Sequence, residues 1–148
     1  MKKILTILII ALVSISPIFA QNNSTKKADK LFDRLEFVKA AEEYLKLADK
    51  SPDNYIIERL ADSYYNIFNT REAEKWYSKI INDEPNAEII FRYSEMLKAN
   101  GKYKESNIWM SKFSEIKPYD TRAIAFRNTP NYIDTVSYTH LRAHETLL

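Results

Sequence analysis

The sequence predicts an all-α protein, a solenoid of about three helix pairs, and three sets of equally spaced residues support this fold class. Pro52, Pro85 and Pro118 stand 33 residues apart. Small residues recur at the same interval, as Ala28, Ala61 and Ser94 in one series and as Ala40, Ala73 and Ser106 in another. Large residues recur as Tyr44, Tyr77 and Met110. A fixed period of this length is typical of repeat proteins, in which each unit buries its apolar face only against its neighbours.

The period divides residues 24–118 into three units, at about 24–52, 53–85 and 86–118. In each unit we expect two amphipathic helices, because apolar residues recur at intervals of three and four. The first unit has the apolar residues Leu31, Phe32 and Leu35, then Phe37, Tyr44, Leu45 and Leu47. The small residues of each unit are expected where its two helices cross closely.

The second unit shows the helical pattern most fully. Its first apolar stripe is Ile56, Ile57, Leu60, Ala61, Tyr64, Tyr65 and Phe68, and its second is Ala73, Trp76, Tyr77, Ile80 and Ile81. Between them, the Asn69 side chain is expected to accept a hydrogen bond from a backbone N–H of the helix. The Glu72 side chain is expected to bind the Asn69 backbone N–H in return, as in a capping box. Pro85 ends the unit, because proline has no N–H and disfavours helix in the residue before it.

The third unit repeats this plan and is followed by one more helix. Its stripes are Ile89, Ile90, Tyr93, Met96 and Leu97, then Tyr103, Ile108, Trp109, Phe113 and Ile116. Gly101 separates the two stripes, and we expect it to adopt the left-handed conformation that ends many helices. After Pro118, residues 119–126 are predicted to form a helix capped by Asp120. A turn-rich connector follows this helix. We therefore predict that residues 119–135 form a short helix and a connector to a missing downstream domain.

This pattern resembles the tetratricopeptide repeat family. The two small positions, the large residue four places after the second of them, and the closing proline all match the family's signature. Phe37 and Tyr103 fill its aromatic position between the two helices, whereas Thr70 departs from it, and the period is one residue shorter than usual. The resemblance implies a right-handed solenoid that offers an interaction surface rather than a catalytic pocket.

The resemblance also implies which residues face the concave groove. It assigns to the groove Phe32, Asp33, Tyr55, Glu58, Asp62, Tyr65, Asn66, Phe91, Glu95 and Lys98. Family members that bind chaperone C-terminal carboxylates need Lys, Arg and Asn there, and Glu58, Asp62 and Glu95 have the opposite charge. We therefore expect a basic or aromatic protein or peptide partner. The alternative is that these are ordinary solvated residues on a spacer.

Residues 1–20 are predicted to be a secretory signal peptide. Two lysines precede an apolar run from Ile4 to Ile15, and Ala20 provides a small residue for cleavage. The alternative is an uncleaved membrane anchor, for which the run is short. Lys2 and Lys3 account for the whole net charge of +2, so the mature chain is neutral, and we expect no nucleic-acid partner. The protein is expected in the periplasm or at the outer membrane.

Residues 136–148 have no relation to the repeat and resemble translated sequencing-adapter DNA, so we interpret them as a non-native tail. His140 and His144 have the spacing of two metal ligands on one helix face, and they suggest a metal hydrolase as the enzyme alternative. Two ligands do not make a zinc site, and their order is not that of His-Glu-x-x-His metalloproteases. We therefore predict no metal, no cofactor and no enzymatic activity.

The order of parts resembles the N-terminal region of Bacteroidetes-type OmpA-like envelope proteins, some of which are associated with type IX secretion or gliding. In that class a leader, a few tetratricopeptide units and a segment like Phe126-Arg-Asn-Thr-Pro-Asn-Tyr-Ile133 precede a β-propeller-like region and a C-terminal peptidoglycan-binding domain. The resemblance implies a non-catalytic docking module that reaches peptidoglycan only through the missing C-terminal domain. The alternative is a complete, secreted, stand-alone tetratricopeptide binding protein.

Overall fold

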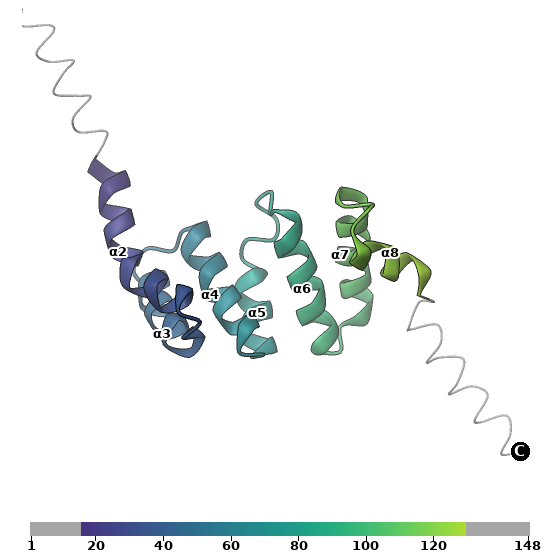
Figure 1. The fold of residues 1–148 in the computed structure, drawn as a ribbon, viewed down its shortest axis with the longest axis horizontal. Coiled ribbons are helices and arrows are strands. Elements are labelled where there is room, and N and C mark those ends of the chain that lie inside the picture. The colour runs from purple at the N-terminus through teal and green to yellow at the C-terminus, as the bar shows by residue number, and fades with distance from the viewer. Residues whose placement is uncertain (1–15, 130–148) are drawn as a thin grey trace, which may run out of the picture.

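The structure is a computed structural model that describes residues 16–129, with side chains from Ser24 onward. Every regular element in this range is a helix, and the helices are α2 (Ser16–Asp33), α3 (Phe37–Ala48), α4 (Asn54–Asn66), α5 (Thr70–Tyr77), α6 (Ala87–Ala99), α7 (Tyr103–Ile116) and α8 (Thr121–Asn128). Figure 1 shows three hairpins, α2–α3, α4–α5 and α6–α7, side by side in a row, with α8 after α7. The expected cleavage position after Ala20 lies within α2.

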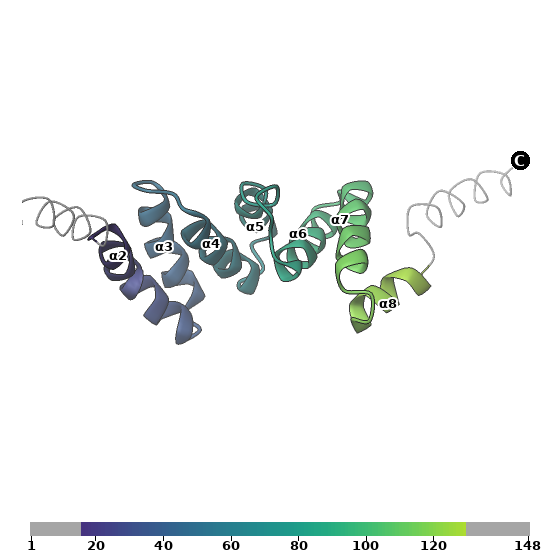
Figure 2. The ribbon, with the colours of Figure 1, turned by 90° about the horizontal axis from the view of Figure 1, so that it is seen from above.

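The row of hairpins has two edges and two faces. The turns inside the hairpins lie at one edge, and the links that follow each hairpin, each with one of the three prolines, lie at the other (Figure 1). Viewed from above, α5 lies on the opposite side of the row from the lower ends of α4 and α6 (Figure 2). The first helices of the hairpins therefore form one face of the array.

The small residues of the repeat are buried where the helices of each pair meet. Ala28, Ala61 and Ser94 in the first helices, and Ala40, Ala73 and Ser106 in the second, are all almost completely buried. In the third pair the Ser106 hydroxyl donates to the Ser94 carbonyl at 2.8 Å, and the Ser94 hydroxyl donates to the Phe91 carbonyl at 2.6 Å. The serines thus keep the close crossing because both hydroxyls find acceptors.

The turns inside the three hairpins have the same backbone geometry. Leu35, Phe68 and Gly101, again 33 residues apart, have φ values of 60°, 58° and 80°. In each turn the next residue donates its N–H to a carbonyl five residues back: Glu36 to Leu31 at 2.9 Å, Asn69 to Tyr64 at 2.9 Å and Lys102 to Leu97 at 2.8 Å. This is the Schellman-type helix end. The left-handed conformation predicted for Gly101 is confirmed.

The same turns correct two interpretations of the sequence. Leu35 and Phe68 do not extend the apolar stripes, because both follow the end of their helix and are 71% and 74% exposed. The predicted capping box is only half formed. Asn69 accepts from the Glu72 N–H at 3.4 Å, but Glu72 binds Lys75 and Trp76 instead of reaching back. The Asn69 N–H already has an acceptor in the Schellman turn, so Glu72 has no open donor there.

Side-chain caps set where α4, α6 and α8 begin. Asp53 and Asn86, each directly after a repeat proline, accept from the N–H groups of Ile56 at 2.8 Å and Ile89 at 3.0 Å. Asp120 accepts from the Arg122 N–H at 2.9 Å, which confirms the predicted cap of α8. Each cap satisfies a donor that the first helical turn would otherwise leave without a partner.

Two predicted stripes of second helices differ from the structure. Helix α5 ends at Tyr77, and Ile80 and Ile81 are buried in the tight turns that follow it. The Ser78 hydroxyl donates to the Lys75 carbonyl at 2.9 Å, which competes with continuation of the helix. In α7, Ile108 and Ile116 are exposed. They occupy the repeat positions of Lys75 and Asp83 in the preceding unit, which are exposed as well.

The departure of Thr70 from the family's aromatic position has a structural reason. The Thr70 hydroxyl donates to the Asn100 side-chain oxygen at 2.6 Å, and the Asn100 amide donates to the Thr70 carbonyl at 3.1 Å and to Glu74 at 2.7 Å. Glu74 also accepts from Lys102 at 2.6 Å. A polar cluster between the second and third pairs therefore occupies the place of an aromatic contact.

Replacing Phe68 with glycine should stabilise the protein. A side chain in the left-handed region is unfavourable and Phe68 is largely exposed, so Phe68→Gly should raise the free energy of unfolding by about 0.5–1 kcal/mol after allowing for the flexibility of glycine. The converse change, Gly101→Ala, should lower it by about 1 kcal/mol. Urea unfolding followed by circular dichroism measures both. Equal stability of both variants and the wild type would contradict the account of the turns.

Candidate functional site

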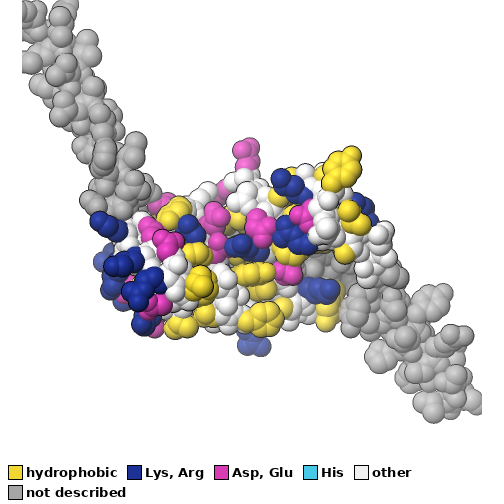
Figure 3. Space-filling view, in the orientation of Figure 1, with side chains coloured by type: hydrophobic (Ala, Val, Ile, Leu, Met, Phe, Trp, Pro, Cys, Tyr) yellow, Lys and Arg dark blue, Asp and Glu magenta, His cyan; other side chains and the backbone are white. Residues whose placement is uncertain are grey.

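The candidate site is the face formed by α2, α4 and α6, which we call the first-helix face. The ten predicted groove residues all lie on these three helices, together with Asp29, Arg59, Glu88 and Arg92. Asp33 and Asn66, the last residues of α2 and α4, are exposed. Figure 3 views this face and shows acidic and basic side chains interspersed over α4 and α6.

Asp62 does not face a ligand, which corrects its assignment to an open acidic groove. It is only 7% exposed. Its carboxylate accepts a hydrogen bond from the Tyr77 hydroxyl at 2.5 Å and forms an ion pair with Arg92 at 2.7 Å. Burial, followed by the charge of Asp62, raises the pKa of Tyr77 far above its ordinary value. Burial acts to lower the pKa of Arg92, but the charge and hydrogen bond of Asp62, together with those of Tyr77, outweigh it and raise this pKa. Asp62 therefore joins the second and third pairs.

Asp29 forms the equivalent link in the preceding unit. It accepts from the hydroxyls of Tyr44 at 2.6 Å and Tyr55 at 2.8 Å, and so links the first and second pairs. Burial acts to raise the pKa of Asp29, but the hydrogen bonds from the tyrosines and Thr25 and the charge of Arg59 outweigh it, so this pKa lies below its ordinary value. Burial and then Asp29 raise the pKa of Tyr44.

The third unit breaks this pattern. Met110 replaces the tyrosine that would reach Glu95, and its sulfur lies 3.6 Å from the Ser94 hydroxyl oxygen. Glu95 accepts from Tyr65 of the preceding unit at 2.6 Å. Burial, and then this contact with Glu95, raise the pKa of Tyr65 to about 12. Two predicted groove residues therefore bind each other.

Arginines stacked on aromatic rings are the feature of this face that the sequence interpretation missed. The Arg59 guanidinium lies 4.5 Å from the Phe32 ring centre and 5.5 Å from that of Tyr55. Arg92 lies 5.3 Å from the Tyr65 ring centre. Arg59 and Arg92 are 33 residues apart, so the repeat spacing contained the signal. Such contacts hold both the cation and the ring in place.

A third stacked arginine comes from α8, and no repeat position predicts it. Arg122 lies 4.1 Å from the Phe91 ring centre and 4.9 Å from that of Phe113. It also pairs with Glu88 at 3.0 Å and with Asp120 at 2.9 Å. Hydrogen bonds from Arg122 lower the pKa of Asp120 to about 2. Helix α8 thus extends the face beyond the third pair.

Glu58 is an acidic residue of this face whose charged form is disfavoured by its surroundings. It is half-buried, and burial, followed by the neighbouring charge of Asp62, raises its pKa above the ordinary value of 4.5. It forms none of the ion pairs found within residues 24–129. A cation placed beside Glu58 would offset the cost of its charge.

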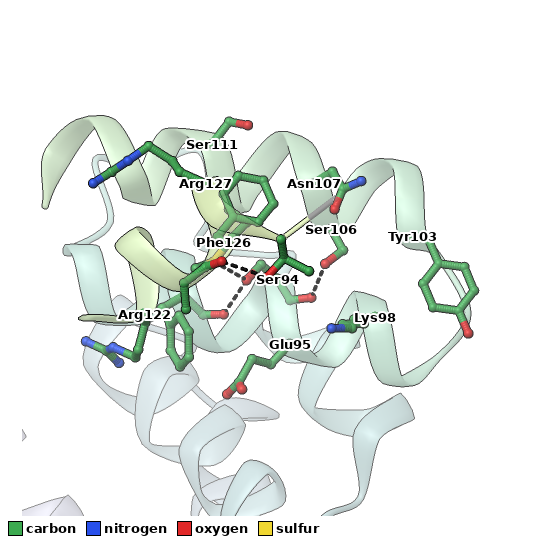
Figure 4. Close-up of a pocket in the computed structure, with 14 residues that line it drawn as sticks. Ser94, Glu95, Lys98, Tyr103, Ser106, Asn107, Ser111, Arg122, Phe126 and Arg127 are labelled. Atoms are coloured by element: carbon green, nitrogen blue, oxygen red, sulfur yellow. Dashed lines mark hydrogen bonds between the residues drawn. The ribbon is translucent and has the colours of Figure 1, made fainter. Parts of the chain in front are cut away.

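A cavity of about 510 Å³ lies between α6, α7 and α8 at the end of the array. In Figure 4, Phe126 of α8 lies across it from Glu95 and Lys98 of α6, whereas the side chains of Arg122 and Arg127 point away from these two residues. The Arg127 guanidinium donates to the Ser114 hydroxyl at 2.8 Å and to the Pro118 carbonyl at 2.6 Å. Lys98 is exposed on its rim, and Asn66, at the corresponding end of α4, donates to the Asp62 carbonyl at 2.7 Å.

Neither a cluster of metal ligands nor a helix suited to span a membrane is found in the region of the chain that the structure describes. Within it, no three His, Asp or Glu side chains come together as metal ligands, and no helix has the length and apolarity to cross a bilayer. His140 and His144 lie outside the described residues, as do most of the predicted leader and the whole of the predicted tail.

Comparison with known proteins identifies the fold. No protein-family model and no curated protein sequence matches this chain. Among solved structures, the second tetratricopeptide domain of human RPAP3, in complex with an HSP70 peptide, matches with a TM-score of 0.62 and 21% identity over 73% of this chain and 92% of the domain. The Hsp90 co-chaperone Cns1 from Saccharomyces cerevisiae matches with a TM-score of 0.61 and 22% identity.

The match to Cns1 covers 88% of this chain but only 43% of Cns1. Both matches show the fold alone. The predicted fold class, an all-α solenoid of tetratricopeptide helix pairs, is confirmed.

Removing the Tyr77 hydroxyl should destabilise the protein. Tyr77→Phe would leave the buried Asp62 carboxylate without one charge-assisted hydrogen bond, at a cost of about 1.5–3 kcal/mol in the free energy of unfolding. The matched control is Tyr119→Phe, because Tyr119 is 92% exposed. Urea unfolding measures both, and an unchanged Tyr77→Phe variant would show that the contact with Asp62 contributes nothing.

Acid should weaken the attachment of α8 only at very low pH. Since the pKa of Asp120 is about 2 in the folded chain, against an ordinary value of 3.8, its contacts stabilise α8 above pH 3.8 and are lost as the pH falls through 2. Carboxyl chemical shifts from NMR should show this midpoint. In Arg122→Gln it should move up towards 3.8, and an Asp120 that titrates normally in the wild type would refute the cap geometry.

Proposed function

We propose that this chain is a non-catalytic protein-interaction module that binds a peptide or protein segment on its first-helix face. The observation that supports this most directly is the series of aromatic rings held under arginines along that face: Phe32 and Tyr55, then Tyr65, then Phe91. Rings already fixed in place offer contact area at little cost in conformational entropy. The human RPAP3 domain in complex with a peptide has the same fold.

The chemistry of the partner follows from the acidic charges that the fold leaves available, since the guanidiniums of Arg59, Arg92 and Arg122 lie against aromatic rings. Asp29, Asp62 and Glu95 are occupied by tyrosines or Arg92, so they add little attraction. Glu58 and Asp33 form no ion pair among the described residues, and Glu58 lies on the same helix as the exposed ring of Tyr55. A segment with basic and aromatic side chains would pair with these carboxylates and stack on the rings.

We further propose that the module acts in the bacterial envelope, as the N-terminal docking region of a larger OmpA-like peptidoglycan-associated protein. The leader-like start, the order of segments and the stretch from Phe126 to Ile133 support this assignment. Peptidoglycan would be bound by a C-terminal domain outside this chain. Sequencing the gene past codon 135 tests the proposal. A frame that continues into a peptidoglycan-binding domain would support it, and a stop codon directly after Leu148 would favour a stand-alone secreted protein.

A charge-swapped pair of peptides tests the groove. A synthetic peptide of alternating lysine and tryptophan should bind, and its counterpart with glutamate in place of lysine should bind at least about tenfold more weakly, because it meets Glu58 and Asp33 with like charge. Glu58→Gln should lower affinity for the lysine peptide by about tenfold. Calorimetry or fluorescence anisotropy measures both.

The pH dependence of this binding should follow Glu58. Only the ionised carboxylate attracts a cation, so affinity for the lysine peptide should fall as the pH is lowered through the pKa of Glu58, which lies above 4.5. The matched control is Glu42→Gln, since Glu42 is an exposed glutamate on α3. Equal loss of affinity in Glu42→Gln and Glu58→Gln would show that net charge, not the first-helix face, determines binding.

A further inference from the structure

The turns at one edge of the array have a property that the fold does not require. Leu35 and Phe68 hold their backbones in the left-handed region, which side-chain-bearing residues avoid, whereas the third turn uses Gly101. All three turns make the same backbone hydrogen bonds, so glycine would serve equally well in the first two. A strained residue that the fold does not need points to a role outside the fold.

The exposure of the Leu35 and Phe68 side chains also indicates a role outside the fold. Leu35 and Phe68 are 71% and 74% exposed, so their side chains add almost nothing to the core. Val38, Ile67 and Tyr103, in or next to the same turns, are exposed as well. These five residues, which we call the turn edge, are half of the large apolar side chains exposed in residues 24–129. The turns inside the hairpins, in or beside which these five residues stand, lie at the lower edge of the array in Figure 1.

Cationic groups lie beside these apolar tips. A hollow of about 600 Å³ between the second and third turns is lined by Arg71, Lys75, Lys102, Thr70, Glu74, Ala99 and Asn100. Lys75 pairs with Glu72 at 2.9 Å and Lys102 with Glu74 at 2.6 Å. Arg71 is exposed and takes part in none of the ion pairs of residues 24–129. A positive charge is therefore available in this hollow, three residues after Phe68 in the sequence.

We propose that the turn edge docks on an anionic phospholipid surface, with Leu35 and Phe68 inserted among the acyl chains and Arg71 at a lipid phosphate. Apolar side chains beside Arg and Lys are the combination that binds the interface of anionic membranes. Leu35 and Phe68 protrude at the ends of hairpins rather than lining a groove, which suits insertion into a deformable surface better than capture of a peptide. This surface is separate from the first-helix face, so the proposal goes beyond the proposed function.

Glycine variants provide a test in which loss of binding cannot be confused with loss of folding. Leu35→Gly and Phe68→Gly remove the tips and relieve the backbone, so both should be at least as stable as the wild type in urea. Each should bind vesicles of phosphatidylethanolamine and phosphatidylglycerol about tenfold more weakly in a flotation assay, because each loses one inserted side chain. Tyr119→Ala, at the opposite edge, is the matched control and should bind normally.

Charge variants test the phosphate contact. Arg71→Gln should bind the phosphatidylglycerol vesicles several-fold more weakly and show less salt dependence, while Lys117→Gln, at the opposite edge, should not. Inorganic phosphate at the concentration of the lipid headgroups should not compete, because it lacks the acyl chains. Glu58→Gln should bind vesicles as the wild type does, which separates failure of this proposal from failure of the peptide groove.

Two results would overturn the proposal. One is a wild-type protein that does not float with anionic vesicles, or floats equally well with phosphatidylcholine alone. The other is a set of glycine variants that bind vesicles as tightly as the wild type. If Phe68→Gly instead abolishes binding of an acidic soluble protein while vesicles are not bound, the turn edge is a protein interface and not a lipid one.

Discussion

The close crossing of two helices at a pair of small side chains is the constraint on which the rest of this structure depends. The chain has no cysteine, so helix packing must hold each pair together. A larger residue at Ala61 or Ala73, both fully buried, would separate the helices and expose the core around them. The third pair meets the same constraint with Ser94 and Ser106, whose hydroxyls bind carbonyls of α6. The two side chains at each crossing must therefore be small, but they need not be apolar.

Polar contacts then set how each pair lies against the next. Tyr55 reaches Asp29, Arg92 reaches Asp62, and Asn100 reaches Thr70 and Glu74, each from one unit to its neighbour. Apolar packing alone tolerates sliding, whereas hydrogen bonds have fixed lengths and directions, so these contacts define one arrangement of the units. They also explain why much of the acidic charge on the first-helix face is already used within the molecule.

The two surfaces of the array differ in kind. On the first-helix face, rings and guanidiniums are stacked and most carboxylates are paired, so the surface is ordered before any partner arrives. At the turn edge, apolar tips are exposed on a left-handed backbone beside the unpaired cation of Arg71. An ordered face suits a peptide, and protruding tips suit a bilayer. A module with both would hold a bound peptide beside a membrane surface.

The sequence alone determined the helix pairs, the small crossing positions, the turn at Gly101 and the cap at Asp120, because each follows from local spacing or from the backbone preferences of one residue. Only the tertiary structure decided which charges remain available. Asp62 and Glu58 look alike in the sequence, yet the first is buried against Tyr77 and Arg92 and the second is not. Likewise, Phe68 continues an apolar stripe by its spacing but follows the end of its helix. Burial and pairing depend on residues half a repeat to a whole repeat away, such as Tyr77 and Arg92 for Asp62, and a local pattern contains no information about them.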